Sequence, residues 1–367
     1  MFARFKKWVQ LCHRMLPHGI RVHLRWTYWA FVAHKKLRME RKEAERIRAS
    51  MQKNGIRNAL IVYDALASPP TYGDYFLVLM LARYFTSQGI SVKFVIVDGE
   101  YRDDWCHLSE FEKKQLVQNY IESARLLLAP SLAAIEISNW VELQDGMQND
   151  KYVNFDIVFK EQILNRKNIY SHVMNTLNLL IDKPNQVSFE KFFLAYEDLV
   201  GKVDLRKLYR PYVTWGCRYS TKWSIDRNLS DELFPQIYAQ LKSLYPTHAI
   251  LVISDDVGCA HFKKIAELLN LECFFSKDFS KSILGDGALI LGSSYFYMMR
   301  GGGIAVFPIF SRIPYELISY APTEDAWKER RLTSWATRYQ IFRYSTLAEK
   351  NPLPTLMVST TTDDRYF

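Results

Sequence analysis

Polar and charged residues gather at four points in the second half of the chain, each at or just after the end of an apolar run. Arg218 follows the run PYVTWG, and Ser254-Asp255-Asp256 follows AILVI. Gly292-Ser293-Ser294 follows GALIL, and Arg300-Gly301-Gly302-Gly303 comes shortly after it. A guanidinium, hydroxyls, exposed backbone amides and a carboxylate suit a nucleotide diphosphate. We therefore expect a phosphate or a sugar to approach these glycines.

Two further cations, Lys222 and Arg227, lie shortly after Arg218. Clustered like charges need a counter-ion from outside, which favours anion binding at Arg218. The alternative for Arg218 is a structural ion pair. The other groups also have structural alternatives: Ser293-Ser294 as helix caps, Asp255-Asp256 as caps of a helix near Val257, and the three glycines as a tight turn. No second acid or histidine cluster has the spacing of a metal site.

In the first half, Asp64, Gly73 and Asp74 surround the turn after the first apolar run. Either carboxylate is a candidate general base. The alternatives are a turn acid at Asp64 and a helix N-cap at Asp74.

The elements that must position these residues alternate between strands and helices. In the first half we expect strands at 57–66 and 91–99 around a helix that Gly89 ends, a helix at 110–128, and further strands at 135–140 and 154–159. Residues 167–181 and 188–200 have a helical period. A strand, helix and strand in succession predict a parallel sheet.

The second half begins the alternation again. We expect strands at 211–220, 248–256, 272–276, 287–294 and 304–309, and helices at 230–245, at 259–270 and across residue 280. The fold class is therefore α/β, with two Rossmann-like domains that face a cleft. The expected division is a basic helical arm at 1–50, an acceptor domain at 51–205, a nucleotide-sugar domain at 206–345 and a tail at 346–367.

The second-half pattern resembles that of the fucosyltransferase superfamily, which includes nodulation, core and protein O-fucosyltransferases. The residues that carry the resemblance are Arg218 after a strand, the run Ser254-Asp255-Asp256, and Asp286 before Gly292-Ser293-Ser294 and Phe296, within about 213–303. The resemblance implies a GT-B fold, a GDP-sugar donor, inversion at the sugar carbon and no metal or other cofactor. It also implies that Arg218 contacts the pyrophosphate and that Asp255, Asp256, Ser293 and Ser294 line the donor pocket.

Charge is concentrated at the start of the chain. Residues 1–50 hold 13 Lys and Arg against three Glu, whereas the whole chain carries a net charge of +9, so the remainder is nearly neutral. Aromatic residues interleaved with these cations suit an anionic membrane surface. The alternatives are a helix docked on the body and, because residues 1–38 contain no acid, a mitochondrial presequence. Five scattered cysteines indicate a reducing compartment.

These observations together predict a metal-independent, inverting glycosyltransferase that lies in the cytoplasm at the membrane periphery. It would move a sugar from a nucleotide-sugar, with a GDP-sugar favoured, to a glycan or lipid-linked acceptor. One alternative is a non-catalytic protein that binds nucleic acid or another anionic polymer through residues 1–50. The neutral body disfavours nucleic acid. A pyruvyl- or phosphotransferase on a similar frame is another alternative.

Overall fold

The computed structural model describes residues 42, 44–51, 55–65, 72–99, 108–129, 131–149, 151–158, 180, 192–199, 201–203, 208, 210–221, 228–299 and 303–318. Most of the basic arm and the tail lie outside this part of the chain, as do Lys222, Arg227, Arg300, Gly301 and Gly302. Residues 44–51 are helical, as predicted, and Ala44 and Ile47 are buried in the main core. The end of the arm therefore docks on the body.

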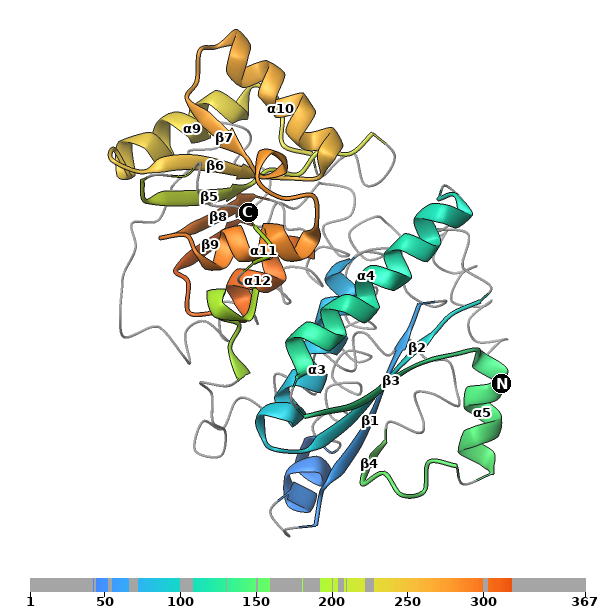
Figure 1. The fold of residues 1–367 in the computed structure, drawn as a ribbon. Helices are drawn as coiled ribbons and strands as arrows, with labels where there is room; N and C mark the ends of the chain where they lie inside the picture. The colour runs from blue at the N-terminus through green and yellow to red at the C-terminus, as the bar shows by residue number, and fades with distance from the viewer. Residues whose placement is uncertain are drawn as a thin grey trace, which may run out of the picture.

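The first half is a parallel sheet with its connecting helices (Figure 1). Its elements are β1 (Asn58–Asp64), α3 (Tyr72–Ser87), β2 (Ser91–Val97), α4 (Glu110–Leu128), β3 (Leu132–Ser138), α5 (Trp140–Gln148) and β4 (Ile157–Val158). The strand order is β3-β2-β1-β4, and every pairing is parallel. Ser109 and Glu112 form a capping box at the start of α4, and Gly89, with a φ of +75°, ends α3.

The second half repeats this plan with one more strand. Its elements are β5 (Tyr212–Gly216), α9 (Leu233–Leu244), β6 (Ala249–Ile253), α10 (Asp256–Leu268), β7 (Cys273–Phe275), η6 (Ser276–Asp278), α11 (Ile283–Leu291), β8 (Phe296–Met299), η7 (Gly303–Ala305), α12 (Val306–Ile309) and β9 (Tyr315–Ile318). The order is β7-β6-β5-β8-β9, again all parallel. Both sheets thus have the strand order of a Rossmann fold, and the predicted α/β class with two Rossmann-like halves is confirmed.

Two predicted strands are wrong. Within the run 287–294, residues 287–291 belong to α11, which Ser282 caps, and the actual strand is β8, further along the chain. The run 304–309 forms η7 and α12. Both runs are short, apolar and buried, and period alone does not separate a buried strand from a buried helix. In addition, α11 begins at Ile283 instead of crossing residue 280, and within the helix expected at 188–200 residues 193–195 are not helical, while Tyr196–Leu199 form η3.

The two halves pack on each other through α3. Every residue of α3 from Tyr75 to Phe85 is buried, because the helix lies between its own sheet and the helices of the second half. The Phe76 ring packs edge-on against Phe307 of α12, with ring centroids 4.9 Å apart. One hydrophobic core therefore joins residues of both halves.

The segment 192–199 precedes the predicted domain boundary at 205 but pairs with the second half. The Leu194 amide donates a hydrogen bond to the Phe310 carbonyl at 2.7 Å, and Leu194 forms an isolated parallel bridge with Ser311. Residues 204–207 lie outside the described part of the chain, so the boundary itself stays a prediction.

Candidate functional site

The strand order of the second sheet changes direction between β5 and β8, which are neighbours in space but not in sequence. Ligands of such sheets bind outside the carboxyl ends of the strands at this switch point. Arg218 follows β5 by two residues, and Gly303, the first residue of η7, follows β8 by four. These two predicted site residues therefore belong to the two connections that flank the switch point.

Ser254 and Asp255 lie beside Arg218 at the carboxyl end of the sheet. The Cys217 amide bonds to the Ile253 carbonyl at 3.0 Å, and the Ser254 hydroxyl donates to the Cys217 carbonyl at 2.6 Å. The Asp255 carboxylate accepts the Gly258 amide at 2.7 Å and caps α10. Asp255 is therefore the N-cap of α10, which is the structural alternative given above for this residue. Asp256 is exposed in the first turn of the helix.

Ser293 and Ser294 lie at the opposite end of the sheet, and the expectation that they share a rim with Arg218 is wrong. The Ser293 hydroxyl lies 2.9 Å from that of Thr214, and the Ser294 amide donates to the carbonyl of Tyr212, the first residue of β5. The reason is that α11, and not a strand, precedes these serines. They therefore enter β8 at its amino end instead of leaving a strand at its carboxyl end.

A buried ion pair lies where η6 and α11 follow β7. Lys277 Nζ contacts Asp286 Oδ2 at 2.6 Å, and the two side chains are only 11% and 5% exposed. The Ser276 side chain also interacts with this carboxylate, whose Oδ1 is buried. Burial raises the pKa of Asp286 to about 6, against the opposing effect of Lys277.

The first half contributes Tyr72 to the same region. The Tyr72 hydroxyl accepts a hydrogen bond from Asn119 Nδ2 of α4 at 2.7 Å. Burial raises the pKa of Tyr72 to about 12, and the nearby charge of Asp286, from the other half, adds to this rise. The carboxyl-end residues of the two sheets thus lie close enough to influence each other's ionisation.

Gly73 and Gly303 bring the two halves into backbone contact. A β-carbon on Gly73 would lie 3.2 Å from the Gly303 Cα, and one on Gly303 would lie 2.8 Å from the Gly73 nitrogen. We expected a ligand to approach Gly303 closely, but it is the start of α3 that does so. The same contact joins the start of η7, which follows β8, to the start of α3, which follows β1.

The two candidate bases lie on either side of the turn after β1. Asp64 is buried as the last residue of β1, and Asp74 lies in the first turn of α3. The charge of Asp74 contributes to the raised pKa of Tyr120, whose main cause is burial. Within the described residues, no group of three or more His, Cys, Asp or Glu side chains is placed to hold a metal ion.

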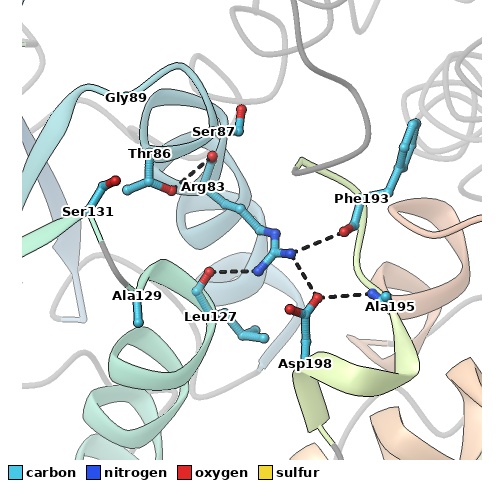
Figure 2. Close-up of a pocket in the computed structure, with 10 residues that line it drawn as sticks. All are labelled: Arg83, Thr86, Ser87, Gly89, Leu127, Ala129, Ser131, Phe193, Ala195 and Asp198. Carbon is cyan, nitrogen blue, oxygen red and sulfur yellow. Dashed lines mark hydrogen bonds and ion pairs between the residues drawn. The ribbon is translucent and has the colours of Figure 1, made fainter.

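A separate cavity of about 360 Å³ lies at the other end of α3, around Arg83 (Figure 2). Arg83 donates to the carbonyls of Phe192, Leu127 and Phe193 at 2.9, 2.7 and 3.1 Å, and it pairs with Asp198 at 2.7 Å. Its charge and most of its donors are thus used within the protein. We assign Arg83 a structural role, in which it ties α3 and α4 to the segment that pairs with the second half.

Sequence reasoning did not single out Lys277 and Asn119 as site residues. Lys277 follows the strand 272–276 that the sequence predicts, so its place at a carboxyl end was a usable signal. The contact of Tyr72 with Asn119 had no such signal, because the two residues are 47 positions apart and only the packing of α3 on α4 brings them together.

No protein-family model matches the sequence, and a comparison with curated proteins finds no match. Among solved structures, the glycosyl transferase family 9 protein from Veillonella parvula DSM 2008 is similar at 9% identity and a TM-score of 0.41, over 76% of this chain and 89% of that one. The ADP-heptose LPS heptosyltransferase II of E. coli is similar at 10% identity and a TM-score of 0.39, over 78% and 99%. Likenesses this distant do not assign a function.

No described helix has both the length and the apolar character needed to cross a bilayer.

Proposed function

We propose that this protein is a metal-independent, inverting glycosyltransferase that uses a nucleotide-sugar donor, with a GDP-sugar favoured. The observation that carries the proposal is the contact of Gly73 with Gly303, which joins the carboxyl ends of two sheets with Rossmann strand order. A donor bound at the switch point of the second sheet would then face a site for the acceptor in the first half.

Arg218 is the proposed partner of the donor pyrophosphate. A guanidinium pairs with two phosphate oxygens at once, and it stabilises the charge that develops on the departing diphosphate. The first turn of α10, which begins next to Arg218, adds the positive end of a helix dipole.

Asp286 and Lys277 are proposed to bind the polar part of the nucleotide. The buried Oδ1 of Asp286 is the proposed acceptor for an N–H or O–H group of the ligand, beside the side chains of Lys277 and Ser276. Lys277 holds the other oxygen and keeps the carboxylate in place.

Inversion requires a group that takes the proton of the attacking hydroxyl, and Asp64 and Asp74 are the two candidates. Asp64 ends β1 and Asp74 lies in the first turn of α3, both in the half of the chain proposed to bind the acceptor. The proposed acceptor is a glycan or a lipid-linked glycan, and residues 1–40 are proposed to bring the enzyme to the cytoplasmic face of an anionic membrane.

A panel of nucleotide diphosphates tests this proposal. Thermal unfolding is measured with GDP, UDP, CDP, dTDP and ADP, because a ligand at 100 times its dissociation constant stabilises the folded state by about 2.7 kcal/mol. The nucleotide-sugar of each binding nucleotide is then supplied, and release of the free diphosphate is followed with and without a glycan acceptor. Failure of every nucleotide to shift the transition rejects a nucleotide-sugar enzyme.

A further inference from the structure

The chain around Arg218 is fixed by backbone contacts at the end of β5. The Leu229 amide donates a hydrogen bond to the Arg218 carbonyl at 2.9 Å, so the connection that leaves β5 at this residue returns to it. Ser220, two residues after Arg218, makes two hydrogen bonds with the side chain of Asn228. The Asn228 Oδ1 accepts the Ser220 amide at 2.9 Å, and the Asn228 Nδ2 donates to the Ser220 carbonyl at 2.8 Å. Residues 218 and 220 are thus held by Asn228 and Leu229, at the returning end of this connection.

The residue between them, Tyr219, is held by a different element. Its ring stacks on the imidazole of His261 in α10, with centroids 3.8 Å apart and planes within 13°. The neighbouring Phe262 meets the Tyr219 ring edge-on at 6.0 Å. This contact fastens the residue after Arg218 to the helix that begins beside Arg218.

Asp231 fixes the orientation of the His261 ring. His261 Nε2 donates to Asp231 Oδ1 at 2.7 Å, and Asp231 lies two residues before α9. Stacking on Tyr219 sets the plane of the imidazole, and this hydrogen bond sets its rotation within that plane. The chain Tyr219–His261–Asp231 therefore joins the connection after β5, α10 and the start of α9.

We propose that His261 is a positioning residue for the donor site, acting through Tyr219 on Arg218. The inference rests on the proposed function, because it takes Arg218 as the partner of the donor pyrophosphate. When the backbone of an arginine is already held in place before the ligand arrives, the residue loses less conformational entropy on binding. Loss of His261 then weakens donor binding while the rest of the fold stays intact.

The experiment uses the full chain and four variants. His261→Ala removes both the stack and the hydrogen bond, and His261→Phe keeps an aromatic ring for the stack. Arg218→Ala reports on the donor site itself. The matched control is His248→Ala, because His248 also contacts a tyrosine ring, that of Tyr245, but precedes the amino end of β6. Hydrogen exchange of the Ser220 and Leu229 amides is measured without ligand, and affinity for GDP is measured by isothermal titration.

We expect His261→Ala to speed exchange at both amides and to weaken GDP binding about tenfold, with the midpoint of thermal unfolding little changed. His261→Phe should keep amide exchange and GDP affinity close to those of the unmodified protein, and His248→Ala should change neither. If Arg218→Ala weakens GDP binding but His261→Ala does not, or if exchange at both amides is unchanged, the inference about His261 is wrong and the proposed function stands. If the unmodified protein binds neither GDP nor another nucleotide diphosphate, the proposed function and the role of His261 in it both fail, whatever the exchange shows.

Discussion

Gly73 and Gly303 come from the two halves of the chain and lie in backbone contact, so that neither position has room for a side chain. The contact closes the space between the first turn of α3 and the turn after β8. It also sets how far apart the carboxyl ends of the two sheets can lie. The two glycines are 230 positions apart, which makes this a tertiary requirement and not a local turn.

A side chain at position 303 should separate the halves at this point. Gly303→Val is expected to destabilise the fold by about 1–3 kcal/mol, the usual cost of overpacking, because its β-carbon would lie 2.8 Å from the Gly73 nitrogen. Denaturant unfolding measures the change. Gly55→Ala is the control, since a β-carbon there meets nothing within 4 Å. Equal stability of Gly303→Val and the unmodified protein would show that this contact is not needed.

Arg83 should contribute strongly to stability. Arg83→Met removes a donor from three carbonyls and the ion pair with Asp198, whose carboxylate keeps only the Ala195 amide among the hydrogen bonds described here, and we expect a loss of about 3 kcal/mol. The exposed Arg125 of α4 provides the control, because Arg125→Met should change the free energy of unfolding by less than about 0.5 kcal/mol. A similar small change in Arg83→Met would contradict the structural role that we give to this residue.

Asp286 should make stability depend on pH in a defined direction. Its pKa is about 6 in the folded protein against an ordinary value of 3.8, so the folded state holds the proton more tightly than the unfolded chain does. The free energy of unfolding therefore falls as pH rises from 3.8 to about 6. Asp286→Asn removes this titration and should flatten that part of the profile. Urea unfolding at several pH values tests this, and identical slopes for the two proteins would contradict it.

The sequence predicts the sheets better than it predicts the site. Strands such as β5 and β6 are buried apolar runs between turn signals, and Gly89 ends α3 as expected. The run GALIL carries the same signal but forms the end of α11. The strand predicted there therefore placed Ser293 and Ser294 at the wrong end of the sheet.

The ion pair of Lys277 with Asp286 and the hydrogen bond of His261 with Asp231 follow from how helices pack over the sheet. The residues of the second pair are 30 positions apart, and no local pattern of sequence encodes their contact. Arg218 could be found because a single rule, polar residues at the carboxyl ends of parallel strands, places it.

The basic arm should bind anionic lipid. Full-length protein is expected to sediment with vesicles that contain phosphatidylserine, and a variant that lacks residues 2–40 should not, because each basic residue contributes roughly 1 kcal/mol near such a surface. The deletion stops before Ala44 and Ile47, which belong to the core. Added salt should weaken binding. Equal sedimentation of both proteins would contradict a membrane role for the arm.

The central claim is that Arg218 binds the diphosphate of the donor, and two arginines at opposite ends of β5 test it directly. Arg210 precedes the strand and pairs with Glu272 at 2.6 Å, whereas Arg218 follows the strand at its carboxyl end. Isothermal titration with GDP, UDP, CDP, dTDP and ADP should identify at least one ligand of the unmodified protein. Arg218→Ala should weaken its binding roughly 10- to 100-fold, as loss of a charged hydrogen-bonded contact does, and Arg210→Ala should leave it unchanged. Equal affinity in Arg218→Ala and the unmodified protein, or no binding of any of these nucleotides, would contradict the account.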